Sequence, residues 1–295
     1  MKRGIWLGIG AYGIWGLFPI YWKWLQHVPA LELVAHRIVW SFIMMLVVMT
    51  VTRRWDKFRH HTASPKLRWT FLLIASLIGV NWLVYVWAVN AGFIVDASLG
   101  YFINPLVSVT LGVVFLKERL RTWQWVPVGM AGAGVIYLTV LYGALPWIAL
   151  TLAFTFGTYG LLKKITPLGP VQGMALETGI LFLPALAWLV FTQMRGDGAF
   201  LHSGPVSDLL MAGAGVVTTI PLLMFAAAAQ SIPLSLVGIL QYLAPTLQFL
   251  IGVLVFDEPL SAQRLVGFCI IWLALILFAA EGWQHHRRKR LVVGF

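Results

Sequence analysis

The chain has 295 residues, of which 60% are hydrophobic and only 11% are charged. Soluble domains carry about 25% charged residues, so this composition excludes a soluble enzyme or binding module and predicts a membrane protein with many spans. The formal net charge is +11. Because the basic residues fall in loops and tails between apolar segments, the partner we expect for them is anionic lipid and not nucleic acid.

Ten apolar segments follow one another along the chain, and each is about long enough to cross a bilayer as a helix. The first one follows Lys2 and Arg3 but has no small-residue cleavage site after it, so we expect a retained helix. The predicted spans are 4–22, 30–51, 69–89, 93–116, 123–142, 145–162, 171–193, 208–229, 234–256 and 262–280.

Lysine and arginine are distributed unequally between the two sets of loops. If the N-terminus is cytoplasmic, seventeen of them lie in cytoplasmic loops and tails, whereas the outside holds three, Lys23, Arg195 and Arg264. Basic residues remain preferentially on the cytoplasmic side of a membrane. The sequence therefore predicts that both termini are cytoplasmic, which requires an even number of spans.

An internal repeat relates the two halves of the chain. Residues 100–120 and 240–260 match at a constant spacing of 140, for instance at Pro105 and Pro245. The loop after the first copy is basic and the loop after the second copy is not. Since basic loops stay on the cytoplasmic side, the two copies are expected to lie inverted relative to each other in the membrane.

The repeat extends to whole units of five spans. At a spacing of 141, Gly16 matches Gly157 and Lys23 matches Lys164. We therefore expect an all-α membrane protein of ten helices in two inverted five-helix repeats. The repeats are predicted at 1–143 and 144–281, and a basic cytoplasmic tail at 282–295. Inverted repeats of this kind are the architecture of secondary transporters.

Polar and aromatic residues inside the spans are the candidate functional residues, because hydrocarbon penalises unpaired polar groups. They concentrate in the first four spans of each unit, which predicts a central cavity with the fifth span of each unit at the periphery. Bends that let the cavity close alternately at the two faces are expected at Gly100, Pro105, Gly238 and Pro245. The residues expected to line the cavity are Trp15, His36, Arg37, Asn81, Trp82, Tyr85, Tyr101, Asn104, Tyr159, Glu177, Gln241 and Tyr242.

The roles of the ionisable residues in the spans stay open at this point. Arg37 and Glu177 either face the cavity or pair within the bundle as structural contacts. His36 is either a proton carrier or a hydrogen-bonded core residue. If Arg37 and Glu177 form one balanced pair in the cavity, a zwitterion or a neutral aromatic solute fits better than a polyanion. Arg37 would then attract an acidic group of the solute.

Motifs of enzymes are absent from the sequence. It contains no Walker loop, no nucleophile elbow and no dinucleotide-binding glycine pattern that follows a strand. We expect no catalytic residues, no metal ligands and no cofactor. Without a nucleotide-binding motif, transport must draw on a gradient or on an external subunit. The expected partners are a small-molecule solute and anionic lipids, and the chain is expected to be a monomer or a homodimer.

Several long motifs carry a resemblance to a known family. They are AYGIWGLFPIYWK (11–23), ELVAHRIVWS (32–41), NWLVYVWAVN (81–90), ASLGYFINPLVSVTLGVVFLKERL (97–120), GTYGLLKK (157–164) and QYLAPTLQFLIGVLVFDEPL (241–260). Through them, nearly the whole chain resembles the RarD subfamily of the EamA-type drug/metabolite transporter superfamily. The resemblance implies ten helices in two inverted repeats, a multi-pass location in a bacterial inner membrane, and export of amino acids or other small metabolites.

Related small multidrug carriers couple transport to protons through a glutamate in their first helix. The first span of this chain has no acidic residue. If protons are coupled here, Glu177 or His36 must carry them.

The function predicted from the sequence is secondary transport of a small organic solute across the inner membrane by alternating access, with proton coupling left open. The solute is an amino acid, an aromatic metabolite or a drug-like molecule. One alternative is an uncoupled facilitator of the same fold, and another is a membrane assembly or regulatory subunit that transports nothing. A membrane enzyme is the third, although the spans show only scattered acids and histidines.

Overall fold

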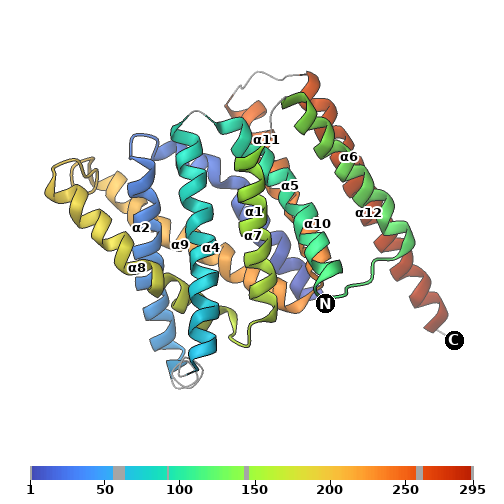
Figure 1. Cartoon of the computed structure of the whole chain (residues 1–295), viewed down its shortest axis with the longest axis horizontal. Coiled ribbons are helices and arrows are strands. Elements are labelled where there is room, and N and C mark those ends of the chain that lie inside the picture. The colour runs from blue at the N-terminus through green and yellow to red at the C-terminus, as the bar shows by residue number, and fades with distance from the viewer. Residues whose placement is uncertain (1, 56–63, 92, 143–145, 257–261, 294–295) are drawn as a thin grey trace.

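The structure is a computed structural model that describes residues 2–55, 64–91, 93–142, 146–256 and 262–293, and this part of the chain is helical without strands (Figure 1). The first unit contains α1 (Lys2–Trp24), α2 (Ala30–Val51), α4 (Pro65–Asn90), α5 (Ile94–Val114), the 3₁₀ turn η1 (Thr122–Gln124) and α6 (Trp125–Tyr142). The second contains α7 (Trp147–Ile165), α8 (Pro170–Met194), α9 (Pro205–Ser231), α10 (Leu234–Gln241), α11 (Leu243–Val255) and α12 (Ala262–Val293).

Over these residues the helices make ten spans, because α10 and α11 are two halves of one crossing. Six spans are both long and apolar enough to cross a membrane by length and composition, namely those at Lys2–Trp24, Ala30–Val51, Pro65–Ala88, Pro170–Met194, Pro205–Ser231 and Leu234–Val255. Five crossings bring the chain to the opposite face, so the second unit runs inverted. The two termini lie on one face of the bundle (Figure 1), which we call the N-terminal face.

Helix pairing follows the same internal symmetry. α1 packs against α9, and the equivalent pair α7 and α4 also packs together. α5 packs against α7, and α1 packs correspondingly against α11. α2–α8, α5–α10 and α6–α12 pair equivalent helices of the two units with each other. The fold is therefore two inverted five-helix repeats that interlock helix by helix.

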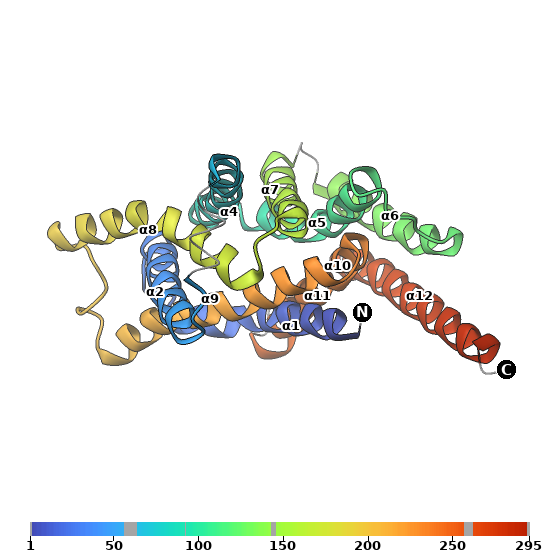
Figure 2. The same cartoon turned by 90° about the horizontal axis from the view of Figure 1, so that it is seen from below.

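The fifth helix of each unit lies at the edge of the bundle. α6 and α12 pack against each other there (Figure 2), away from α2 and α8. Small residues allow this close approach, since a Cβ on Gly267 would lie 2.6 Å from a methyl carbon of Leu138. The helix of α12 continues to Val293. The predicted basic tail is thus a continuation of the last helix where it is described.

The helix is broken at one of the two predicted proline bends, near Pro245, and continuous at the other, Pro105. The ninth span is interrupted at Tyr242, one residue after α10 ends at Gln241. Pro245 accounts for this break because its ring clashes with the carbonyl group four residues earlier, at Gln241, and it has no N–H to donate. The equivalent Pro105 lies inside α5, which is one continuous helix.

The other two predicted bends, Gly100 and Gly238, are positions of close packing. A Cβ on Gly100 would lie 3.1 Å from the carbonyl oxygen of Ala149, and one on Gly238 would lie 2.7 Å from that of Pro105. The second contact fixes α10 against the C-terminal half of α5. By contrast, α5 makes few contacts with α11, so the two spans diverge beyond this crossing.

A carboxylate holds the crossing of α5 and α10 at the N-terminal face. Glu118, just after α5, accepts hydrogen bonds from the backbone N–H of Leu234 at 2.7 Å and of Ser235 at 2.9 Å. These amides begin α10 and have no acceptor inside the helix. The negative charge at a helix N-terminus adds to the stabilisation. The bundle is therefore closed tightly at this end.

We predict that Gly215→Ala destabilises the protein by about 1–3 kcal/mol, since overpacking a tight contact has this cost. A Cβ there would lie 2.5 Å from the backbone carbonyl carbon of Trp40, where α9 crosses α2. The measurement is thermal unfolding in detergent. Gly132→Ala is the control, because a Cβ there meets nothing within 4 Å, and it should leave stability unchanged or slightly raised. Equal melting temperatures for the two variants would contradict the packing of α2 on α9.

Candidate functional site

A cavity of about 300 Å³ lies between the two units, inside the bundle. Helices α1, α2, α4, α5, α7, α9, α10 and α11 all contribute to its wall, whereas the peripheral pair α6 and α12 does not. The lining residues are Tyr12, Trp15, Phe18, Pro19, Trp22, Arg37, Asn81, Trp82, Tyr85, Gly100, Tyr101, Asn104, Leu152, Phe156, Leu222, Gln241, Ala244, Pro245 and Gln248.

The structure brings eight of the twelve predicted cavity residues together in this wall. They are Trp15, Arg37, Asn81, Trp82, Tyr85, Tyr101, Asn104 and Gln241. The other four, His36, Tyr159, Glu177 and Tyr242, lie outside the lining and are buried in the surrounding bundle. Each of these four has a packing or pairing role that is described below.

On the α1 wall of the cavity, sequence reasoning found only Trp15. Tyr12, Phe18, Pro19 and Trp22 line it together with Trp15. These positions recur every three or four residues and therefore share one face of the helix. That periodicity was the available signal, but aromatic residues on one face of a span are also the ordinary pattern of helix packing.

Arg37 is the charged residue among the described residues of the cavity wall. Its Nε donates a hydrogen bond to Oγ1 of Thr218 on α9 at 2.9 Å. Its guanidinium carbon lies 5.1 Å from the ring centroid of Trp22 and 4.8 Å from that of Trp82. Such cation–π contacts stabilise a desolvated guanidinium by about 2 kcal/mol. Among the described residues, no carboxylate forms an ion pair with Arg37.

The amide side chains of the wall differ in whether their polar atoms have hydrogen-bond partners. Nδ2 of Asn81 donates to the backbone oxygen of Leu152 and to Oγ1 of Thr155, both at 2.9 Å, which ties α4 to α7. By contrast, Oδ1 of Asn104 and Oε1 of Gln241 are buried and have no partner among the described residues. These two acceptors belong to wall residues on α5 and α10, and a solute with an N–H or O–H group would satisfy them only after their side chains rotate toward the cavity.

An aromatic cluster lies under the cavity toward the N-terminal face. Tyr159 stacks on Phe225 with centroids 5.9 Å apart, and Tyr12 meets the same ring edge-on at 6.2 Å. Tyr12 and Tyr159 are each only 1% exposed. Tyr159 therefore packs beneath the residues that line the cavity, and solute does not reach it in this conformation.

Glu177 forms a buried ion pair below this cluster. Its Oε1 lies 2.5 Å from Nζ of Lys163, and its Oε2 accepts a hydrogen bond from the hydroxyl of Tyr159 at 3.0 Å. Lys163, which was counted among the loop charges, is instead only 1% exposed and belongs to α7. Of the two alternatives for Glu177, the contacts in this structure match the structural one. It does not balance the charge of Arg37 in the cavity.

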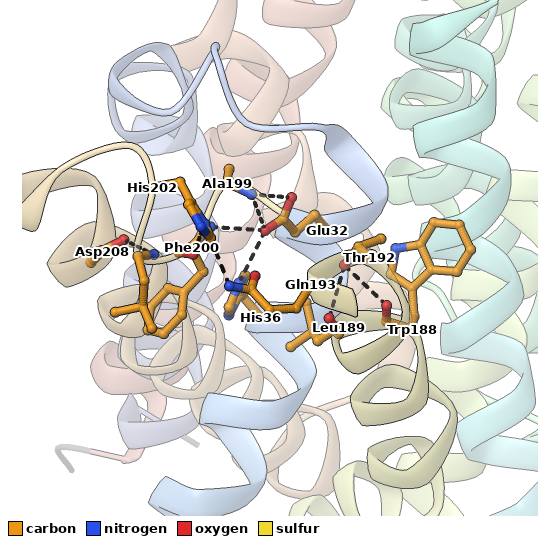
Figure 3. A network of polar contacts seen from close by, with 11 residues as sticks. Glu32, His36, Trp188, Leu189, Thr192, Gln193, Ala199, Phe200, His202 and Asp208 are labelled. Carbon is orange, nitrogen blue, oxygen red and sulfur yellow. Dashed lines mark hydrogen bonds and ion pairs between the residues drawn. The ribbon is translucent and has the colours of Figure 1, made fainter. Parts of the chain in front are cut away.

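His36 and Glu32 lie near the opposite face, under the loop between α8 and α9 (Figure 3). Glu32 accepts hydrogen bonds from the backbone N–H of Ala199, at 2.8 Å, and of Phe200, at 3.2 Å. The His36 ring packs on Phe200 with centroids 4.8 Å apart, and its Nε2 is 3.7 Å from Glu32. Neither ring nitrogen of His36 has a hydrogen-bond partner among the described residues. Glu32 therefore anchors the loop, and His36 packs beneath it outside the cavity.

Tyr242 marks the break between α10 and α11. It is fully buried, and its hydroxyl donates a hydrogen bond to the backbone oxygen of Phe102 at 3.3 Å. This contact links the broken span to α5 on the side away from the cavity.

Comparisons with known proteins agree with this architecture. A model of the EamA-like transporter family matches the chain at residues 2–140 and 145–280. Protein RarD of Streptomyces exfoliatus is 45% identical over 289 residues, which cover 98% of this chain and 92% of that protein. The chain belongs to the EamA-like transporter family, in its RarD subfamily. This EamA-like protein is therefore a multi-pass membrane transporter of the drug/metabolite type.

Other relatives and a solved structure extend the comparison. The uncharacterized transporter YojE of Bacillus subtilis is 48% identical, with 94% of this chain and 93% of that protein covered. A "chloramphenicol-sensitive protein RarD" of Pseudomonas aeruginosa is 32% identical over 98% of this chain and 96% of that protein. A solved crystal structure shares the fold of this EamA-like chain, with a TM-score of 0.71 and 15% sequence identity. The match covers 94% of this chain and 97% of the chain in that structure.

We predict that Glu177→Gln destabilises this EamA-like transporter by about 3 kcal/mol or more, because the ammonium group of Lys163 is left buried without its counter-charge. Thermal unfolding in detergent measures the effect. The double variant Lys163→Met with Glu177→Gln is the control. It has no unpaired buried charge and should recover most of the lost stability. A double variant as unstable as the single one would contradict the ion pair as the cause.

We predict that Glu32→Ala speeds hydrogen exchange of the Ala199 and Phe200 amides about 10-fold or more, since hydrogen bonds to a charged group contribute about 1.5–3 kcal/mol. Hydrogen–deuterium exchange of the loop peptides measures this. Arg195→Ala is the matched control in the same loop. Its ion pair with Asp197 joins side chains that are 63% and 69% exposed, so exchange should stay near that of the unaltered protein. Equal exchange in all three proteins would exclude Glu32 as the anchor.

Proposed function

We propose that the chain is a secondary transporter that moves a small organic solute by alternating access through the cavity between its two units. The observation that carries the proposal is the asymmetric closure of the bundle. α5 and α10 are packed tightly at the N-terminal face, and an aromatic cluster and a buried ion pair lie beneath the cavity on that side. On the other side α5 and α11 diverge. This arrangement is typical of a transporter conformation that is closed at one face and open to solute at the other.

The orientation belongs to the same proposal. The excess of Lys and Arg in the loops that share a side with the termini supports cytoplasmic termini. The cavity then faces the outside in this conformation, and the closed face is cytoplasmic. The relatives come from Gram-negative and Gram-positive bacteria, so the membrane proposed is the bacterial plasma membrane, which is the inner membrane in Gram-negative cells.

The geometry bears on proton coupling as well. A carrier in which proton and solute compete for one group needs that group in the solute cavity. His36 and Glu177 both lie outside the lining. This placement supports a facilitator, or a carrier whose coupling acts through helix packing, over direct competition at these two residues. Transport of this kind needs no cofactor and no bond-breaking chemistry. The proposed partners are the solute and anionic lipid, and the proposed state is a monomer or homodimer.

The proposal predicts that filling the cavity abolishes solute binding and flux. Asn104→Trp places an indole where a buried, unsatisfied amide lines the cavity. Val114→Trp is the control on the same helix, because Val114 is 61% exposed on the outer surface. Uptake into proteoliposomes is measured for a panel of amino acids, aromatic acids, amphenicols and organic cations. Flux that survives Asn104→Trp would contradict transport through this cavity. If cells need this protein for a process, and the Asn104→Trp variant still supports that process, the protein is instead an assembly or regulatory subunit.

A further inference from the structure

The electrostatic character of the cavity is set by one residue. Among the described side chains that line it, Arg37 is the one that carries a formal charge at neutral pH. Glu177, the acid that the sequence offered as its counter-charge, is held by Lys163 outside the lining. The cavity of the described structure is therefore cationic, and a low-dielectric site of this sign favours an anion over a neutral molecule or a cation.

The guanidinium of Arg37 is fixed in place through Nε and its contacts with two indoles, and its outer donors have no acceptor among the residues that the structure describes. Nε donates to Thr218, and the guanidinium carbon lies over the rings of Trp22 and Trp82. Neither Nη atom has a hydrogen-bond acceptor among the described residues, and the side chain lines the cavity. A planar fork of N–H donors oriented in this way matches the two oxygens of a carboxylate.

The rest of the wall indicates what the carboxylate is attached to. A volume of about 300 Å³ equals that of about ten liquid waters at about 30 Å³ each, so a solute of roughly a dozen non-hydrogen atoms fits. Trp15, Phe18, Tyr85, Tyr101 and Phe156 supply broad aromatic surfaces. Such walls select a flat apolar body, and they disfavour a polyanion that would need several counter-charges.

We propose that the cavity binds an aromatic monocarboxylate, with its carboxylate on Arg37 between Trp22 and Trp82 and its ring among the aromatic residues of α1, α4 and α7. This inference rests on the proposed function and names its substrate class. Rotation of the Asn104 or Gln241 side chain would turn its unsatisfied oxygen toward the cavity, as a second point of recognition for a donor on the solute. The same carboxylate chemistry is shared by a simple aromatic acid and by an aromatic amino acid, which differ in whether they bring an ammonium group to these acceptors.

The test compares four probes of matched size on the purified full-length protein. They are 3-phenylpropanoate, its uncharged amide 3-phenylpropanamide, phenylalanine and 2-phenylethylamine. Dissociation constants are obtained from ligand-dependent thermal stabilisation and from calorimetry. We expect the unaltered protein to bind 3-phenylpropanoate or phenylalanine at least 10-fold more tightly than the amide and the amine. Tighter binding of phenylalanine assigns the amino acid as the source of the carboxylate, and tighter binding of 3-phenylpropanoate assigns the simple acid.

Substitution of Arg37 then locates the carboxylate. Arg37→Gln should weaken the acid about 10- to 100-fold, the range of a charge-assisted hydrogen bond, and change the affinity for the amide by less than about 3-fold. Arg37→Lys keeps the positive charge but lacks the planar pair of N–H donors, so it should recover part of the lost affinity for the acid. Retained binding of the amide shows that the cavity is intact in each variant.

The outcomes separate this inference from the proposed function. If the amide or the amine binds the unaltered protein as tightly as the acids, the carboxylate inference is wrong while solute binding in the cavity stands. The same holds if both acids bind but Arg37→Gln leaves their affinity unchanged. If solutes of other classes are transported and all four probes fail to bind, the inference alone is overturned. If no solute of any class binds or is transported, the proposed function fails with it.

Discussion

Polar groups inside a membrane must find their partners within the protein, because hydrocarbon offers none. This constraint explains where the charges of the bundle lie. Lys163 and Glu177 neutralise each other below the cavity, Glu118 accepts the first amides of α10, and Glu32 accepts those of the loop after α8. The first contact joins the consecutive helices α7 and α8, and the other two join segments distant in sequence. The same interactions that satisfy the charges therefore hold the helices together. Arg37 is held by a hydroxyl and two indoles but by no described carboxylate, and its remaining capacity is directed to the cavity.

The inverted repeat gives the two faces equivalent backbones but different chemistry. Glu177 corresponds to His36 at the spacing of 141, and Lys163 corresponds to Trp22. At the N-terminal face this pair is a buried salt bridge, whereas at the other face the histidine packs under a loop and the tryptophan lines the cavity. Lys164 donates to the backbone oxygens of Ala229 and Ile232, while its counterpart Lys23 lies over the ring of Phe256. The two faces therefore cannot be closed by identical contacts.

The fold could be predicted closely from the sequence because bilayer thickness fixes the length of each span. The second span, predicted at 30–51, is α2 at Ala30–Val51, and most others differ by a few residues at their ends. The exception is the last span, predicted to end at 280, because α12 continues to Val293. The limits of the two repeats and the sidedness of the termini stay predictions. The cavity was predicted in part, because polar residues in spans are conspicuous. The α1 wall, apart from Trp15, was not predicted because aromatic residues also pack ordinary spans. The sequence left two alternatives for Glu177, because its partner Lys163, next to Lys164, resembled a loop charge.

Accessibility of the cavity from the two sides of the membrane tests the account most directly. The chain has one cysteine, Cys269, so Cys269→Ala with Ala244→Cys leaves a single thiol in the cavity wall. A membrane-impermeant maleimide is applied to right-side-out and to inside-out vesicles, with and without transported solute. The account predicts labelling from the face opposite the N-terminus without solute, and labelling from the N-terminal face as well during transport. A thiol that is reached from one face under every condition, while solute still crosses the membrane, would contradict alternating access through this cavity.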